Sequence, residues 1–421
     1  MRRTGEIFGK IDKITILLYL ILILFGWLNI FASVYNDDIT KSIFDLTTKY
    51  GKQLLFIGIS IFIGFIILII DWRFFDSLSF ILYCIVISSL ILVLFTPNSV
   101  GGASSWFDFG RFKLQPSEFA KFATALALAK MFSLNKHSKF SITSMIRSYI
   151  IILIPFLLII IQNDTGTALI FLSFILVLYR EGLSGNILIM GIIAIILSLF
   201  TLLINPIILS MIVTTIIITI YLISSNRIRS IKVSSIITIL CNATIYSVNY
   251  IFYNILPKHQ VERINVLLGK DFDPLNAGYN LIQSKIAIGS GGFLGKGFLN
   301  GTQTRFDFVP EQSTDFIFCT VGEEWGFVGS LFFLIIFSTL LLRIIYLSEK
   351  QKSQFCRVYG YSVACILFSH LIINLAMTIG LAPTIGIPLP FMSYGGSSLL
   401  SFTILLFIFI NLDSYRMDIL R

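Results

Sequence analysis

The chain has 421 residues, of which 56% are hydrophobic and 13% charged, and its formal net charge is +9. Soluble domains carry roughly 25% charged residues, so this composition excludes an ordinary soluble protein and predicts an all-α polytopic membrane protein. The lysines and arginines form no clustered basic face, which argues against a nucleic-acid partner and favours basic cytoplasmic loops.

Apolar runs of about 20 residues, the length needed to cross a bilayer, recur along the whole chain. The first follows a basic N-terminus but is longer than the apolar part of a signal peptide, so we expect it to stay in the membrane. We predict about twelve spans in a single membrane domain, residues 1–421. They are 14–35, 54–71, 78–96, 117–133, 147–162, 165–181, 186–204, 206–224, 233–256, 316–345, 358–381 and 397–413.

An even number of spans places both termini on one side of the membrane. Lysines and arginines gather in alternate short loops, and the positive-inside rule then puts both termini in the cytoplasm. Three polar regions fall outside: 97–116, 257–314 and 382–396. The first is rich in aromatic residues and predicts an interfacial segment. The last contains three prolines, so it should line a cavity or be covered by protein.

Ionisable residues inside spans cost at least about 2.5–3.5 kcal/mol each and commonly mark function. Glu118 and Lys121 lie three residues apart at the start of the fourth span, so they share a helix face and can pair. Two interpretations remain open from the residues alone. The pair is a buried structural ion pair, or it forms a polar patch in which Lys121 is available to an anionic ligand.

Two aspartates stand where the chain enters a span on the outer side. Asp164 lies in a short hairpin, where Asn, Asp and Gly also serve turn geometry, so a supporting role is only one of two interpretations. Asp315 precedes an apolar run, where it either caps the helix or acts chemically. Glu323, two turns further on, lies near the same face, with packing against another helix an equally good explanation.

Six glycines occur within the thirteen residues from Gly289 to Gly301. Neither G-x-G-x-x-G nor G-x-x-x-x-G-K-[ST] matches this run, and no βαβ pattern surrounds it, so a nucleotide site is excluded. We expect these glycines to let the backbone pass close to a ligand or to neighbouring helices. The five cysteines stand singly, and with three histidines the chain shows no metal-site spacing.

Four blocks of sequence together resemble the SEDS proteins (shape, elongation, division and sporulation), and within them the RodA branch. The third block is long and specific, and its QSKIAIGSGG and GTQT wording is similar to that branch. The blocks are GGASSWFDFGRFKLQPSEFAK (101–121), NDTGTALI (163–170), DPLNAGYNLIQSKIAIGSGGFLGKGFLNGTQTRFDFVPEQSTDFIF (273–318) and GIPLPFMSYGGSSLL (386–400).

The resemblance implies a peptidoglycan glycosyltransferase of the bacterial cytoplasmic (inner) membrane. It implies an extracytoplasmic active site that polymerises lipid II, working with a class B penicillin-binding protein and other membrane proteins of the elongation complex. In this family the aspartate of the TDFIF motif is catalytic, which points to Asp315. The family's cavity residues fall on Glu118, Lys121 and Asp164.

The chain departs from the family pattern in two places. Ser105 precedes Trp106 where relatives commonly carry a basic residue, so the phosphate contact of that residue would have to come from Arg111 or Lys113. The family typically has ten spans, so our count of about twelve implies an extra pair within 186–256.

Glycosyl transfer from a lipid diphosphate needs one base, because the diphosphate leaves without protonation. Asp315 as that base would take the proton from the 4-OH of N-acetylglucosamine, and a single attack would invert the anomeric carbon and give β-1,4 strands. Charge growing on the departing undecaprenyl diphosphate needs cations or a divalent metal such as Mg or Mn. The candidate cations are Lys121, Arg111, Lys113, Lys285 and Arg305.

Two other functions suit a polytopic bundle with a polar cavity. A flippase for lipid-linked oligosaccharide would need polar groups at several depths, whereas here they crowd on the outer side. A non-catalytic scaffold for a penicillin-binding protein would make Asp315 dispensable. The outer position of the polar groups argues against the flippase, and the family resemblance is the main reason to favour the enzyme over both.

Overall fold

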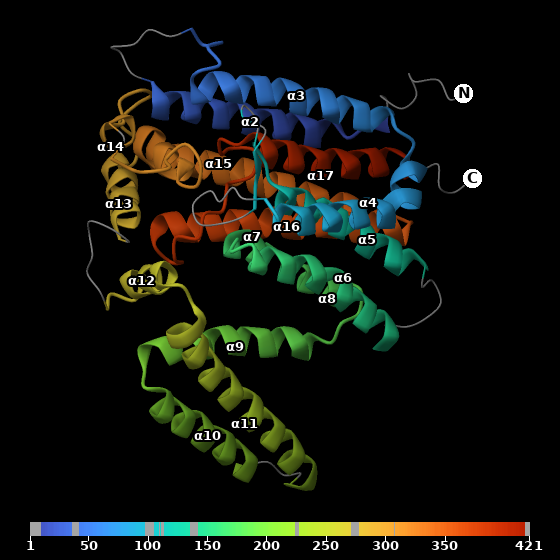
Figure 1. Ribbon diagram of the computed structural model, residues 1–421, viewed down its shortest axis with the longest axis vertical. Coiled ribbons are helices and arrows are strands. Elements are labelled where there is room, and N and C mark those ends of the chain that lie inside the picture. The colour runs from blue at the N-terminus through green and yellow to red at the C-terminus, as the bar shows by residue number, and fades with distance from the viewer. Residues whose placement is uncertain are drawn as a thin grey trace. The chain divides into compact units, whose positions relative to one another are not determined.

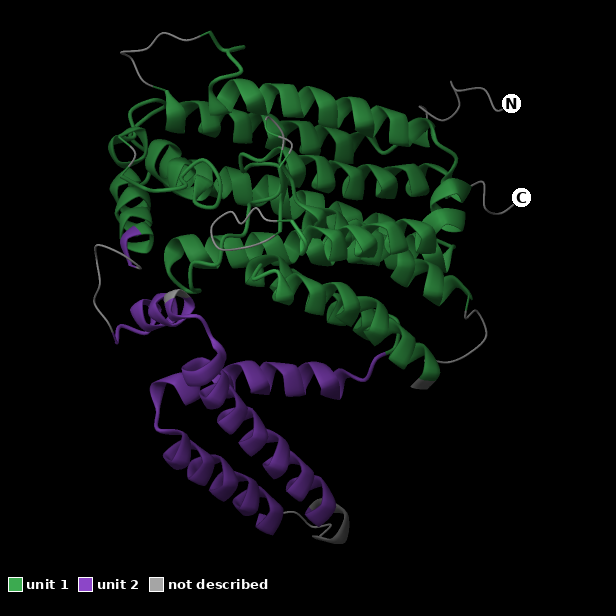
Figure 2. Ribbon diagram, in the orientation of Figure 1, with its two compact units in different colours: residues 1–182, 280–421 green, residues 183–279 purple. Residues whose placement is uncertain are grey.

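In a computed structural model of the chain, the structure describes residues 10–35, 42–96, 105–108, 110, 113–134, 142–223, 227–270, 278–306 and 308–416. The chain forms two compact units (Figures 1 and 2): unit 1 comprises residues 1–182 and 280–421, and unit 2 comprises residues 183–279. Both consist of membrane-type helices, and the expectation of a single membrane domain stays a prediction.

Unit 1 is almost entirely helical, as expected for an all-α membrane protein (Figure 1). Its described residues include one strand pair, formed by β1 (Phe107–Asp108) and β2 (Lys113–Leu114). Its helices are α2 (Lys13–Val34), α3 (Lys49–Ile69), α4 (Trp72–Val93), α5 (Pro116–Leu134), α6 (Ile142–Ile161), α7 (Thr165–Phe171), α8 (Phe174–Arg180), α13 (Tyr279–Gly291), α14 (Thr302–Arg305), α15 (Ile317–Glu349), α16 (Gln354–Ile379) and α17 (Gly396–Ser414).

Unit 2 contains the segment 186–256, which lies between the second and third motif blocks. Its helices are α9 (Gly185–Leu203), α10 (Pro206–Ile223), α11 (Arg227–Tyr250), the π-helical turn η1 (Ile251–Ile255) and α12 (Lys258–Leu267). Within this unit α11 packs along α10 and also contacts α9. Most of the large apolar side chains on these helices are exposed, as expected for helices that face lipid.

All twelve predicted spans coincide with helices, and ten helices in the described residues are long and apolar enough to cross a membrane. The other two predicted spans, 117–133 and 165–181, do form helices but do not meet this description. α5 carries three charged residues within its 19 positions, and 165–181 is divided into the two seven-residue helices α7 and α8. The long polar region 257–314 includes α12, α13 and α14.

The core of unit 1 is built around α5 and α17, whose side chains are mostly buried. α5 packs against α4 and α16, and α17 packs against α3. Alanines at 120, 123, 125, 127 and 129 allow neighbouring helices to approach the α5 backbone closely.

α15 is broken at Gly326, whose φ of 63° and ψ of −154° are not helical. The break frees carbonyls before it and N–H groups after it, and the glycine loop, residues 292–301, binds both. Lys296 and Gly297 donate their N–H groups to the carbonyls of Glu323 and Glu324, at 3.0 and 2.9 Å. The N–H groups of residues 327 and 328 donate to the carbonyls of residues 292 and 293, at 3.0 and 3.2 Å. Because lipid offers no hydrogen bonds, this pairing is what allows the broken helix inside a membrane protein.

Candidate active site

The proline-rich segment, residues 382–395, joins α16 to α17 without forming a helix, as its prolines predict. Side chains from neighbouring helices satisfy its backbone carbonyls. Asn374 Nδ2 donates to the Ile387 carbonyl at 2.7 Å, and His370 Nδ1 lies 3.1 Å from the Pro388 carbonyl. Gln53 Nε2 donates to the Ser393 carbonyl at 3.4 Å. The segment is therefore covered by protein and held from at least two helices.

Asp315 lies half-buried in the turn that leads into α15, and the proline-rich segment holds this turn. The Ser393 hydroxyl donates to the Thr314 carbonyl at 2.6 Å, and the Tyr394 N–H donates to the Ser313 carbonyl at 2.8 Å. The N-cap residue of α15 is Phe316 rather than Asp315. Asp315 therefore lies one residue before the N-cap, and its catalytic role stays a prediction.

Glycines mark two close approaches of the proline-rich segment, one to Asp315 and one to α7. A Cβ built on Gly386 would lie 3.3 Å from Asp315 Oδ2, and the φ of Gly386 is +76°. On α7, a Cβ built on Gly166 would lie 2.9 Å from the Ile385 carbonyl. The proline-rich segment thus passes between the turn of Asp315 and the helix that Asp164 begins.

Asp164 caps α7 and ties it to the start of α5. Its Oδ1 accepts from the Thr167 N–H at 3.1 Å, as expected of an N-cap. Its Oδ2 accepts from Gln115 Nε2 at 2.8 Å and from the Ser117 hydroxyl at 3.0 Å. Asp164 therefore joins the start of α7 to the start of α5.

Glu118 and Lys121 form a buried ion pair, with Lys121 Nζ 2.9 Å from Glu118 Oε2 and side-chain exposures of 1% for Lys121 and 2% for Glu118. The same ammonium group lies 2.9 Å from His370 Nε2 and 4.4 Å from the centroid of the Phe402 ring. The Lys121 ammonium is thus enclosed by three protein groups, an arrangement that suits the structural ion-pair interpretation.

We expect Lys121→Met to lower the free energy of unfolding by about 3–5 kcal/mol, because it leaves the carboxylate of Glu118 buried without a partner. Lys130→Met on the same helix is the matched control. Lys130 pairs with Asp76 at 2.8 Å, but both are partly exposed, so its loss should cost about 1 kcal/mol or less. Thermal unfolding in lipid nanodiscs compares the two variants, and equal losses would contradict the buried pair.

The remaining predicted cations occupy three different places. Lys113 is exposed and lies 3.6 Å from Asp108, while its carbonyl accepts from Ser397 at the start of α17. Lys285 is exposed, and its ammonium lies beside Gly380 at the C-terminus of α16. Arg305 belongs to the region of the glycine loop, donating to the Leu299 carbonyl at 3.3 Å. Arg111 lies outside the described residues.

Lys49, at the start of α3, is a site candidate that the sequence analysis missed. Its ammonium donates to the Ser313 hydroxyl at 3.0 Å, two residues before Asp315. The residue is exposed, and no carboxylate in the described part of the chain forms an ion pair with it. The available signal was its place in a loop predicted to lie outside, where the positive-inside rule disfavours lysine.

Glu323 serves the glycine loop rather than the proline-rich segment. Its buried carboxylate accepts from Lys296 Nζ at 2.6 Å and from the N–H groups of Gln303 and Thr304 at 2.8 and 2.9 Å. It thereby binds the start of α14 and neutralises a lysine. These contacts explain why a carboxylate is present within an apolar helix.

Two other features bear on ligands. Among the described residues, no group of three or more His, Cys, Asp or Glu side chains could hold a metal ion, so a divalent metal at the diphosphate stays a prediction.

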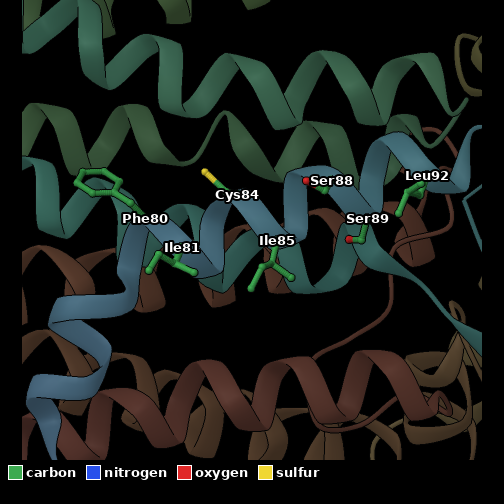
Figure 3. A pocket seen from close by; sticks show the side chains of 7 residues that line it. All are labelled: Phe80, Ile81, Cys84, Ile85, Ser88, Ser89 and Leu92. Carbon is green, nitrogen blue, oxygen red and sulfur yellow. The ribbon is translucent and has the colours of Figure 1, made fainter.

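A separate groove of about 580 Å³ runs along α4 (Figure 3), and its lining is mainly apolar. It is lined by Phe80, Ile81, Cys84, Ile85, Ser88, Ser89 and Leu92.

Comparison with known proteins places the chain in a family. The family model of the FtsW, RodA and SpoVE cell cycle proteins matches residues 12–210 and 190–418. The peptidoglycan glycosyltransferase MrdB of Escherichia coli strain K12 is 32% identical over 320 residues, which are 76% of this chain and 73% of that protein.

Solved structures show the same fold. A chain in a structure of a peptidoglycan synthase complex that coordinates polymerization and crosslinking superposes with a TM-score of 0.69 at 25% identity, covering 96% of this chain and 98% of the other. RodA of Thermus thermophilus superposes with a TM-score of 0.63 at 21% identity, covering 96% and 97%. The chain is therefore a multi-pass, all-α membrane protein that belongs to the FtsW/RodA/SpoVE family.

Proposed function

We propose that the protein is a peptidoglycan glycosyltransferase that polymerises lipid II, with Asp315 as the general base. The observation that carries this proposal is the half-buried Asp315, held beside Gly386 by the proline-rich segment that also contacts the Glu118–Lys121–His370 cluster. The related protein from Escherichia coli is named for this activity, and its similarity to this chain supports the assignment.

In the proposed reaction, Asp315 removes the proton from the sugar 4-hydroxyl as that oxygen attacks the anomeric carbon of the lipid-linked donor. The bond from the anomeric carbon to the diphosphate breaks, and undecaprenyl diphosphate leaves with both bonding electrons. One displacement inverts the α-linked donor to a β-1,4 product. No second carboxylate is required, since the leaving group needs no proton.

We place both termini in the cytoplasm. The face of the protein that carries Asp315 then lies on the outer side of the bacterial inner membrane. Basic residues in the alternate short loops support this orientation. We further propose a class B penicillin-binding protein as the partner. The similarity to a chain of a peptidoglycan synthase complex supports that pairing.

Lys49 is proposed as a cation for the diphosphate. Lys49 is exposed, and its ammonium binds the hydroxyl of Ser313, which precedes Asp315 by two residues in the sequence. We expect Lys49→Ala to raise the KM for lipid II about tenfold with little change in melting temperature. Lys52→Ala, an exposed lysine on the same helix, is the control. Equal KM values for both variants would refute the role of Lys49.

The full-length protein, purified with its penicillin-binding partner and supplied with lipid II, tests the function directly. Glycan strands on a gel are the expected product. A parallel assay in liposomes follows movement of labelled lipid II across the bilayer. Transbilayer movement without polymer would replace the enzyme by a flippase, and partner binding without either activity would indicate a scaffold.

A further inference from the structure

α16 presents two buried polar side chains, His370 and Asn374, to the proline-rich segment. They are four residues apart, so they lie one above the other on the same helix face. Both are at most 1% exposed. They bind adjacent carbonyls, those of Pro388 and Ile387. We refer to these two side chains as the α16 clamp.

The partners of His370 determine where its proton is. The Pro388 carbonyl can only accept, so Nδ1 at 3.1 Å must carry a hydrogen. The Lys121 ammonium can only donate, so Nε2 at 2.9 Å must offer a lone pair. Both contacts are satisfied together by one state, a neutral imidazole protonated on Nδ1. The hydrogen bond at one nitrogen thus sets the role of the other.

The clamp connects the two parts of the candidate site. His370 extends from the proline-rich segment to Lys121 and, through it, to Glu118. Asn374 donates at once to the Ile387 carbonyl and to the Asp315 carbonyl, at 2.7 and 2.8 Å. The position of the proline-rich segment beside Asp315 is therefore coupled to the buried ion pair on α5.

We propose that His370 is a positioning residue for glycosyl transfer. It fixes the proline-rich segment against the Glu118–Lys121 pair, and this keeps Asp315 in its place beside Gly386. This inference rests on the proposed function. His370→Leu removes the acceptor for Lys121 and the donor for Pro388, whereas His370→Gln retains one group of each kind. The two substitutions therefore separate the hydrogen-bonding role from the filling of space.

The tautomer is tested without any assay of activity. The chain has three histidines, so ¹⁵N-histidine labelling of the full-length protein in nanodiscs gives few signals, and His370→Gln identifies the one sought. We expect a neutral ring with its proton on Nδ1 at neutral pH. A proton on Nε2, or on both nitrogens, would overturn the clamp.

Kinetics test whether the clamp matters for the reaction. We expect His370→Leu to lower kcat for lipid II polymerisation about tenfold per folded complex, and His370→Gln to restore most of the rate. Phe368→Leu, at a 46% exposed position on the same helix, controls for a general effect on α16. A wild-type rate in His370→Leu, or equal losses in the Leu and Gln variants, would overturn the positioning role.

The two experiments separate the inference from the function on which it rests. If the wild-type complex makes no polymer, the proposed function fails, and the NMR result still confirms or overturns the clamp. If the wild-type complex makes polymer and the tautomer is wrong, the function stands and the inference fails.

Discussion

Asp315→Ala is expected to lower the rate of lipid II polymerisation by about 10²–10⁴-fold, the usual contribution of a general base. Asp315→Asn should lose as much, because an amide fills the same space and cannot take a proton. The hydrogen bond from Asn374 goes to the backbone carbonyl of Asp315, so both variants keep it.

The measurement is the initial rate with the purified full-length complex, normalised to folded protein. Glu262→Gln, at an exposed carboxylate of α12, is the control for removing one negative charge. Full activity of Asp315→Ala at a normal level of folded protein would remove Asp315 from the mechanism.

Gly295→Ala is expected to destabilise the protein by about 2–4 kcal/mol. Its φ of +81° disfavours any side chain, and an added Cβ would lie 2.1 Å from the backbone oxygen of Glu324. The substitution would push the glycine loop away from the break in α15 and free the groups that the loop satisfies. Thermal unfolding and the yield of folded protein in nanodiscs are the measurements.

The same glycine run provides graded controls. Gly292 has a positive φ but open space around its Cβ position, so Gly292→Ala should cost only about 1–2 kcal/mol. Gly289 has open space within α13, and Gly289→Ala should be neutral or stabilise by up to about 1 kcal/mol. Equal stability of the three variants would show that the contact with α15 is unimportant.

Features that depend on local sequence could be predicted well. Runs of apolar residues correctly placed ten of the twelve predicted spans on helices long and apolar enough to cross a membrane, because the length and hydropathy of a span are local properties. The prolines of segment 382–396 correctly predicted irregular backbone covered by protein. The glycines of 289–301 correctly predicted close backbone approach, at the break in α15.

Partners distant in sequence could not be predicted. His370 lies 249 residues from Lys121, and Lys49 lies 264 residues from Ser313, so no local pattern joins either pair. The role of Glu323 could not be predicted for the same reason, since its hydrogen-bond donors belong to residues 19 to 27 positions earlier in the chain. The roles of Asp315, Glu118 and Lys121 in catalysis came from family resemblance, and the proposed experiments decide them.

The break in α15 also has a consequence for how the protein is made. The glycine loop precedes α15 in the chain, so the ribosome completes it before the residues around Gly326 emerge. The donors and acceptors for the broken helix are therefore already available when that segment reaches the translocon. A circular permutation that moved residues 279–301 behind α15 would reverse this order. The helix would then have to enter the bilayer with four backbone groups unpaired, and insertion efficiency in a cell-free translation system with membranes should fall.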